Sequence, residues 1–404
     1  MRNITQSLGM ALFLGTPLAA QAQVSGDVVR IGVVTDLTGI YSEFAGQGLV
    51  SAVEMAVEDV GGEVAGQPIE IIVEDSRLDP EHSVDVATRL REQENIDMLT
   101  GMVGSNTALA VQEYGAQAGL ITMNTVSATA NLTGPACSPY GIHWTYDTWA
   151  LSAGTVNAVV KEGGKRWFFL VADYEFGYTM EEQARGAAES SGAEVVGRAL
   201  TPYQGEDFSE QLQQAMASEA NVIALANAGG DLQRTIRQAY ELGLQNGERY
   251  PVALLMFLTD IRHLGLYVTA GLKFTTGFYW DRNEDTRAWS ERFTARTGSK
   301  PSMAQAGAYS AVRHYLLSIA DTGSDDSDAV MQAMRERPVN DFFATNGQLR
   351  PDGRMVHDMY LAEVKSPTQS RGAWDYLRIL RTIPGEEAFR PMDQGGCPLV
   401  SAGS

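Results

Sequence analysis

Long apolar runs, basic residues and cysteines are all scarce in this chain of 404 residues. After residue 22 no uninterrupted apolar stretch reaches about 18 residues, the length that a membrane-spanning helix needs. Thirty basic residues stand against fifty acidic ones, so the long-range field has the wrong sign for nucleic acid or an anionic membrane surface. We therefore expect no membrane insertion and no nucleic-acid partner.

Motifs for catalysis and cofactor binding are missing as well. The chain has no GxSxG nucleophile elbow, no HExxH and no phosphate-binding GxxxxGK(S/T). Gly46-Gln47-Gly48 begins like a dinucleotide fingerprint, but Ser51 replaces the third glycine and the motif does not directly follow a strand. The five histidines lie scattered without ligand spacing: His82, His143, His263, His314 and His357. We expect no enzymatic activity, no cofactor and no metal site, and no motif supports the alternative of a secreted hydrolase.

The first residues have the pattern of an export signal. Arg2 supplies a positive end, and the apolar run of residues 8–18 is too short to cross a bilayer. Ala20-Gln21-Ala22 then provides the small-x-small pattern that a signal peptidase reads. We expect residues 1–22 to be a signal peptide and the mature protein to reside in the periplasm.

The two cysteines, Cys137 and Cys397, form an even pair in a compartment where disulfides persist. Neither belongs to a CxxC or Cys/His cluster, so a zinc site is disfavoured. We expect a disulfide between them, with two free buried thiols as the alternative.

Short β-branched runs alternate with helical patterns through the first 260 residues. Residues 28–34, 69–73, 98–101 and 120–123 are predicted strands, and the helix between the first two carries one apolar stripe along residues 49–60. The alternation restarts after Tyr146, with predicted strands at 167–172, 194–200, 221–226 and 252–257. Strand, helix and strand at this spacing imply right-handed crossovers and a parallel sheet covered on both faces. The sequence predicts an α/β fold with two lobes, each holding a mostly parallel, doubly wound sheet.

At this point several segments together resemble a known family. In order along the chain they read VRIGVVTDLTG, EFAGQGLVSAVEMAVEDV, LTGMVGSNTALAV, ITMNTVSATANLT and VADYEFGYTMEEQARGAAESSGAEVVG. Each segment is short, but their order and spacing are specific. The chain resembles the periplasmic solute-binding proteins of the branched-chain amino acid type, and the resemblance covers nearly all of the mature chain.

This resemblance implies the type I periplasmic fold, in which two lobes are joined by three crossings and close on a ligand as a hinge. It divides the chain into lobe 1 (residues 23–145 and 281–338) and lobe 2 (residues 146–280 and 339–375). Residues 376–404 would form a C-terminal segment tied back by Cys397. The resemblance also implies a monomer that delivers a small molecule to an ABC transporter permease, and a ligand-sensing subunit is the alternative from another class.

Residues of lobe 1 that follow strands are the first candidates for ligand contact. Ser105, Asn106 and Thr107 open a helix, where hydroxyl, amide and free backbone N–H groups suit a carboxylate. The alternative for Ser105 is a simple helix cap. The resemblance implies a second contact: Ser127, Ala128 and Thr129 match the family segment that holds the ligand's amino and carboxylate groups, with an ordinary Ser/Thr turn as the alternative. Tyr41 lies on the first loop, where its aromatic ring could form a wall of the pocket.

Lobe 2 supplies the facing candidates at its own strand ends. Tyr174 resembles a ligand-facing position of the family, and Asn227 and Phe257 end later strands. An acidic side chain in the family pairs with the substrate's ammonium group near the position of Asp260. The leucine-binding member carries Glu there in a different local sequence, so this chain departs from the pattern at that point.

These residues imply a small amphipathic acid as the ligand. With Asp260 facing the cleft, a hydrophobic or branched-chain amino acid is favoured, because a buried ammonium without a counter-charge is expensive. With Asp260 facing away, an aromatic or aliphatic carboxylate or amide is the better choice.

The signal pattern gives a direct prediction about processing. Protein recovered from the periplasm should begin at Gln23, because cleavage follows Ala22. N-terminal mass spectrometry measures this, and intact Met1 in a cytoplasmic fraction would contradict it.

Overall fold

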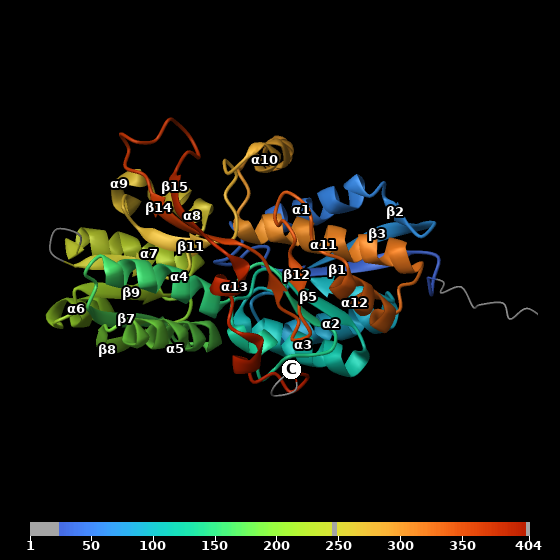
Figure 1. Cartoon of the computed structure of the whole chain (residues 1–404), viewed down its shortest axis with the longest axis horizontal. Coiled ribbons are helices and arrows are strands. Elements are labelled where there is room, and N and C mark those ends of the chain that lie inside the picture. The colour runs from blue at the N-terminus through green and yellow to red at the C-terminus, as the bar shows by residue number, and fades with distance from the viewer. Residues whose placement is uncertain (1–23, 245–248, 401–404) are drawn as a thin grey trace, which may run out of the picture.

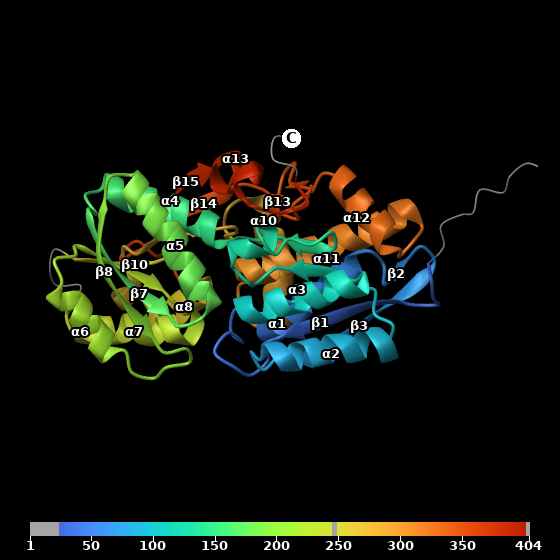
Figure 2. The same cartoon turned by 90° about the horizontal axis from the view of Figure 1, so that it is seen from below.

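The structure is a computed structural model that describes residues 24–244 and 249–400. The predicted signal peptide, residues 1–22, lies outside them. The described chain forms two lobes side by side, with α13 (Gly385–Ala388) between them (Figures 1 and 2). Among the described helices, none has the length and apolar character needed to cross a membrane.

Lobe 1 is built on a six-stranded sheet with the order β2-β3-β1-β4-β5-β6. All neighbours run parallel except the hairpin of β2 and β3. The strands are β1 (Val29–Thr35), β2 (Glu63–Val64), β3 (Gln67–Asp75), β4 (Met98–Thr100), β5 (Ile121–Asn124) and β6 (Gly141–His143). The central strands are continuous apolar runs because both faces of the sheet are covered.

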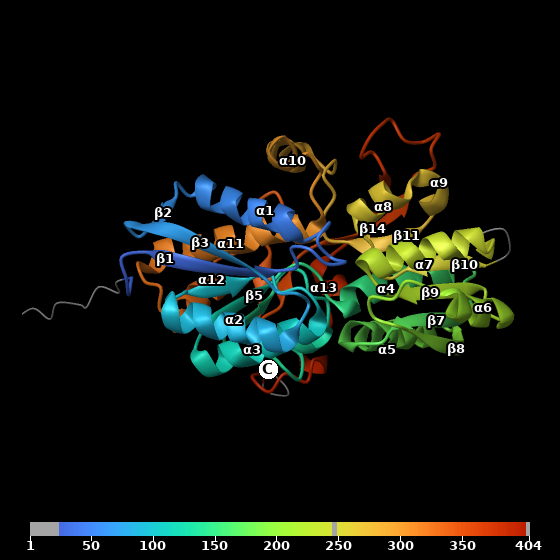
Figure 3. The same ribbon diagram turned by 180° about the vertical axis from the view of Figure 1, so that it is seen from behind.

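Two groups of helices cover the lobe 1 sheet. One face carries α1 (Gly46–Asp59) and α11 (Met303–Thr322), and the other carries α2 (Pro80–Gln93) and α3 (Ser105–Ala118), as Figures 1 and 3 show. The remaining helices of the lobe are α10 (Glu284–Thr297) and α12 (Ser327–Glu336). The α11 and α12 segments therefore return to the first lobe, and the predicted doubly wound architecture is confirmed.

Lobe 2 has a four-stranded parallel sheet with the order β10-β9-β7-β8. Its strands are β7 (Arg166–Ala172), β8 (Glu194–Thr201), β9 (Val222–Ala226) and β10 (Tyr250–Ala253). Its helices are α4 (Thr148–Lys161), α5 (Glu175–Ser190), α6 (Ser209–Ala217), α7 (Gly229–Glu241), α8 (Leu258–Leu264) and α9 (Leu266–Thr269). An antiparallel sheet completes the lobe and has the order β11 (Lys273–Thr276), β14 (Met359–Val364) and β15 (Leu377–Ile383).

Strand β10 ends earlier than the predicted strand 252–257. The apolar run continues beyond Ala253, but Phe257 is already the N-cap of α8. The side chain of Asp260 accepts the Phe257 N–H at 2.8 Å and so starts the helix. Apolar periodicity alone does not show where a buried strand ends when the buried residues that follow it are also apolar.

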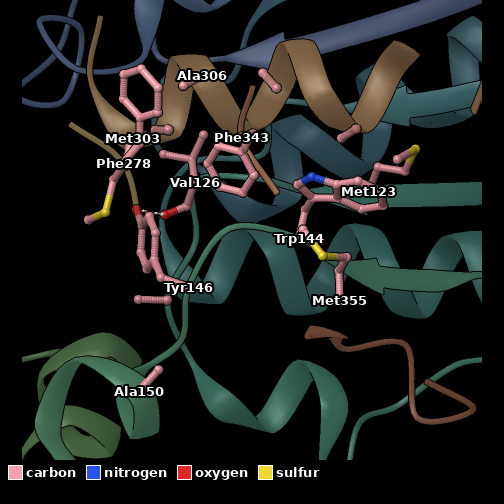
Figure 4. Close-up of a cluster of buried hydrophobic side chains, with 14 of the residues drawn as sticks. Met123, Val126, Trp144, Tyr146, Ala150, Phe278, Met303, Ala306, Phe343 and Met355 are labelled. Carbon is pink, nitrogen blue, oxygen red and sulfur yellow. Dashed lines mark hydrogen bonds between the residues drawn. The ribbon is translucent and has the colours of Figure 1, made fainter. Parts of the chain in front are cut away.

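Three crossings join the lobes and share one apolar cluster. The first runs through residues 144–147, the second through 277–283, and the third through 357–358, between β13 (Met355–Val356) and β14. Figure 4 shows Trp144 and Tyr146 of the first crossing and Phe278 of the second packed together with Phe343 and Met355, which precede the third. The Tyr146 hydroxyl donates to the carbonyl of Val126, and the Trp144 indole N–H donates to Ser310 Oγ at 3.2 Å.

The third crossing lies later than the sequence-based division at residue 338. A backbone bridge joins Val339 to Gly347, and another joins Arg354 to His143 of β6. The strand β12 (Gln348–Leu349) also contacts α12. Because the contacts of Arg354 and β12 are with lobe 1, the chain returns to lobe 2 only at β14, whereas the division assigned all of 339–375 to lobe 2.

The predicted disulfide between Cys137 and Cys397 is confirmed, with 5.6 Å between the two Cα atoms. The expected C-terminal segment, residues 376–404, has two parts within the described range. Its first part is β15 in the lobe 2 sheet, and its later part reaches lobe 1 at the disulfide.

Two glycines of α5 give a matched test of the packing that places this helix at the cleft. A Cβ on Gly177 would lie 2.0 Å from the carbonyl oxygen of Ala172, whereas a Cβ on Gly186 meets nothing within 4 Å. We expect Gly177→Ala to destabilise the protein by about 1–3 kcal/mol through overpacking. We expect Gly186→Ala to be neutral or stabilising by about 0.5–1 kcal/mol. Thermal unfolding midpoints check both, and equal midpoints for the two variants would contradict the packing described here.

Candidate ligand-binding site

The carboxyl ends of the two parallel sheets face each other across a small cavity between the lobes. Such facing edges are where open α/β sheets bind ligands. The cavity has a volume of ≈ 20 Å³, and both lobes contribute to its lining. The lining residues are Tyr41, Phe44, Val103, Gly104, Ser105, Val126, Ser127, Ala128, Tyr146, Tyr174, Phe176, Ala228 and Leu255.

A larger depression of ≈ 520 Å³ lies at the outer side of the hinge and is lined by Asp281, Arg282 and Tyr360, among others. It collects residues from the second crossing and from the antiparallel sheet rather than from parallel strand ends. Topology therefore favours the smaller cavity as the ligand site, despite the difference in size.

The start of α3 forms one pole of the cavity. Gly104 is the N-cap, adopts a φ of 85° and contributes no side-chain cap. The backbone N–H groups of Ser105, Asn106 and Thr107 have no acceptor within the described chain. Because the N-terminal end of a helix carries partial positive charge, this pole favours an anion.

The loop of residues 127–129 is held by lobe 1 and by the first residues of α4. The carbonyl of Ser127 accepts from His143 Nε2 at 2.7 Å, and that of Ala128 accepts from the Thr148 N–H at 2.8 Å. Burial, with the nearby charge of Arg354, lowers the pKa of His143 well below its usual value, so the ring is neutral. Both carbonyl groups already have donors, which leaves the loop few acceptors to offer a ligand.

Aromatic side chains form the walls of the cavity. The hydroxyl groups of Tyr41 and Tyr174 lie 2.6 Å apart and join the two lobes. Burial raises the pKa of both well above the usual range, so both are neutral phenols. Tyr203 packs against Tyr174 with 4.5 Å between ring centroids.

Two predicted residues of lobe 2 lie behind the lining rather than in it. Phe257 stacks on Phe44, with ring centroids 3.9 Å apart, and so supports the wall from behind. Asn227 is fully buried and donates to Thr235 Oγ1 at 2.8 Å within its own lobe.

Asn106 and Thr129 reach across the cleft to Glu175, the first residue of α5. Thr129 Oγ1 donates to Glu175 Oε1 at 2.9 Å, and Asn131 Nδ2 donates to the same oxygen at 2.8 Å. The Glu175 N–H donates to Asn106 Oδ1 at 3.2 Å. These bonds form a latch between the lobes at the edge of the cavity.

Asp260 is fully buried and has both carboxyl oxygens engaged. Oδ2 accepts the Phe257 N–H, and Oδ1 accepts from Gln233 Nε2 at 2.8 Å. Gln233 Nε2 also lies 3.1 Å from Glu43 Oε2 on the other lobe. Asp260 is not among the residues that line the cavity.

Charge is absent from the lining of the cavity, in which every residue is apolar, aromatic or hydroxyl-bearing. Within residues 24–244 and 249–400, no group of three or more His, Cys, Asp or Glu side chains is placed to hold a metal ion. The chemistry that the site offers is hydrogen-bond donation at the start of α3 and contact with aromatic walls.

The structure adds residues that the sequence patterns did not single out. Tyr146, Phe176 and Leu255 line the cavity, and Glu175 forms the latch. Phe176 follows Tyr174 by two positions at the start of α5, so its place was within reach of the same strand-end reasoning. Tyr146 belongs to a crossing, and no local pattern distinguishes it from a residue of the core.

The environment of Asp260 predicts a pH dependence of stability. Burial, with the charge of Glu43, raises the pKa of Asp260 to about 7, against about 4 in an unfolded chain. Between these values the folded state binds more protons than the unfolded state, so this contribution to stability falls as the pH rises. The unfolding free energy of the parent relative to Asp260→Asn should therefore decrease from about pH 4 to pH 7 and level off above.

Chemical denaturation across this pH range measures the effect. The exposed Asp393 supplies the control Asp393→Asn, which should follow the parent. Parallel curves for the parent and Asp260→Asn would contradict the assignment.

Comparison with known proteins agrees with this architecture. The sequence model of a family described as periplasmic binding protein matches residues 28–372. The crystal structure of a periplasmic binding protein from Burkholderia mallei is 41% identical, with a TM-score of 0.91 over 92% of this chain and 99% of that one. A branched-chain amino acid ABC transporter periplasmic ligand-binding protein from Burkholderia xenovorans LB400 is 33% identical, with a TM-score of 0.83 over the same shares.

A curated relative, Leu/Ile/Val-binding protein homolog 6 of Brucella abortus, is 27% identical over 209 residues. That match covers 51% of this chain and 52% of the relative, so the chain matches about half the length of this relative. The family match spans both lobes and the facing strand ends described above. The chain belongs to the periplasmic binding protein family.

Proposed function

We propose that this protein is the extracytoplasmic receptor of an ABC importer and that it captures a small carboxylate with an aromatic or aliphatic body and no ammonium group. The observation that carries the proposal is the cavity between the lobes, which has free N–H donors at the start of α3 and no acidic side chain in its lining. The ligand's carboxylate would take the place nearest Ser105.

An ammonium group is disfavoured by the state of the loop carbonyl groups and of Asp260. The carbonyl groups of Ser127 and Ala128 already have donors, and both oxygens of Asp260 are engaged. A buried ammonium that lacks an acceptor or counter-charge costs far more than the roughly 2–7 kcal/mol of an unpaired neutral polar group. A carboxylate meets the opposite situation, because donors are free for it.

The body of the ligand is constrained by the walls. Tyr41, Phe44, Tyr146, Tyr174 and Phe176 surround the cavity with rings, which suits a flat or branched apolar group. The hydroxyl pair of Tyr41 and Tyr174 must part to admit such a group, so binding requires the lobes to move. The Glu175 latch then closes on the occupied site.

The remainder of the proposal concerns partners. A receptor with a hinged cleft is expected to act as a monomer, to carry out no chemical step, and to present its closed form to the permease of the importer.

A second candidate ligand is a branched-chain amino acid. It is favoured by what the names of the relatives from Burkholderia xenovorans and Brucella abortus say of those proteins. Under that reading Asp260 would turn from Gln233 to the ammonium group when the lobes open.

Matched pairs of ligands separate the two candidates. Isothermal titration calorimetry of the refolded protein compares two pairs of ligands, and the members of each pair differ only by the ammonium group. 3-Phenylpropanoate should bind more tightly than L-phenylalanine, and 4-methylpentanoate more tightly than L-leucine. Ser105→Ala should weaken binding of the carboxylate by about 1–3 kcal/mol. Asp260→Asn should leave its affinity unchanged.

The control is Ser370→Ala, in the loop between β14 and β15, which should bind as the parent does. Tighter binding of leucine, lost in Asp260→Asn, would establish the amino acid in place of the carboxylate. Unchanged binding in Ser105→Ala would show that the Ser105 hydroxyl does not contact the carboxylate, which would leave the backbone N–H groups at the start of α3 as its only donors there.

A further inference from the structure

Within the C-terminal segment, residues 384–397 leave one lobe and end on the other. These residues begin where β15 ends in lobe 2, and their helix α13 packs against α4 of the same lobe. The N–H of Gly385 donates to Asp358 Oδ1 at 3.2 Å, next to the third crossing. The segment is therefore firmly attached to lobe 2 at its start.

Its other end is attached to lobe 1. Arg390 Nη2 donates to the carbonyl of Ala130 at 3.1 Å, and the Arg390 carbonyl accepts from Arg350 Nη1 at 2.9 Å. The disulfide then joins Cys397 to Cys137. Ala130 directly follows the loop of residues 127–129, so the segment contacts the backbone that carries the ligand-facing loop.

Between the two attachments the segment packs on the hinge itself. Phe389 is buried, lies 4.5 Å from the guanidinium of Arg354 and 5.3 Å from the ring of His357. Arg354 donates to the carbonyl of Tyr146 at 3.1 Å, and His357 Nε2 to that of Thr145 at 2.7 Å. Since the Tyr146 side chain lines the cavity, the segment supports the first crossing from the side away from the ligand.

We propose that residues 384–397, fastened by the Cys137–Cys397 disulfide, act as a fourth covalent crossing that positions the ligand-facing loop and limits how far the two lobes separate. Hinged closure is set by the few chain segments that join two rigid bodies. A fourth link that packs outside the first and third crossings resists bending and twisting that three links alone permit. The inference rests on the proposed receptor function only in requiring that the lobes move.

The disulfide is the decisive part of this link. Beyond Arg390 most residues up to 400 are exposed or half-buried, with Gly395 and Cys397 as the exceptions. Few apolar contacts would hold this stretch on lobe 1 after the bond is broken, and segments with few buried contacts open readily. Reduction should therefore release the end of the segment from lobe 1 while each lobe stays folded.

The test measures the interlobe distance without any ligand. Dyes attached through a genetically encoded, non-cysteine amino acid at Glu92 of α2 and Glu241 of α7, both exposed, report the distance by single-molecule energy transfer. In Cys137→Ser/Cys397→Ser the distance distribution should be broader than in the parent, with its mean shifted to longer distances. An unchanged or narrower distribution, in a variant whose circular dichroism matches the parent, overturns the proposal.

A second experiment uses the folded parent protein, so its result does not depend on how well the double cysteine variant folds. The parent, once folded and oxidised, is reduced with a phosphine and should show the same broadening, whereas the double variant should not respond to the reductant. Arg337→Ala, which loses only an ion pair with Asp321 inside lobe 1, is the matched control and should keep the parent distribution. A parent that is unaffected by complete reduction overturns the proposal, and neither arm depends on whether the ligand is a carboxylate or an amino acid.

Discussion

The hinge depends on the hydrogen bonds and the ion pair of one buried side chain, the guanidinium of Arg354. Nη1 donates to the carbonyl of Tyr146 and lies 3.4 Å from Asp147 Oδ2, while Nε donates to the carbonyl of Met355. Burial lowers its pKa to about 10, which still leaves it charged at neutral pH. Asp147 in turn caps α4 by accepting the Ala150 N–H at 2.8 Å. One buried cation therefore holds the first and third crossings together and, through Phe389, the C-terminal segment; replacing it would leave a buried carboxylate without its partner.

The sheets of the two lobes can be predicted from local patterns in the sequence. Continuous apolar strands bounded by turns, with amphipathic helices between them, specify a parallel sheet wherever they occur, which is why β1, β7 and β9 were placed from residues alone. The sequence does not predict the end of β10, because the apolar run that contains this strand continues through Phe257 into residues at the cavity wall. The position of the third crossing is not predicted for a related reason: the bridge that ties this segment to lobe 1 joins His143 and Arg354, which lie far apart in the sequence.

Part of the site can be predicted once the strands are placed, because ligand-facing residues follow the strand ends. Residues just after strand ends, such as Ser105, Ser127 and Tyr174, do line the cavity. Sequence position does not say which way a side chain turns, however, and Thr129 and Asn106 bond to Glu175 rather than line the cavity. The orientation of Asp260 depends on Gln233 and on the start of α8, neither of which a spacing pattern encodes.

The disulfide has a consequence for the order in which the molecule is assembled. It joins residues separated by 260 positions, and Cys397 follows the last strand of lobe 2. Because a chain is made and emerges from its N-terminus, Cys137 must wait for both lobes to be synthesised before it meets its partner. The bond therefore gives no guidance while either lobe forms its core. It is a closing step, made on two lobes that already pack well enough to bring residues 137 and 397 together.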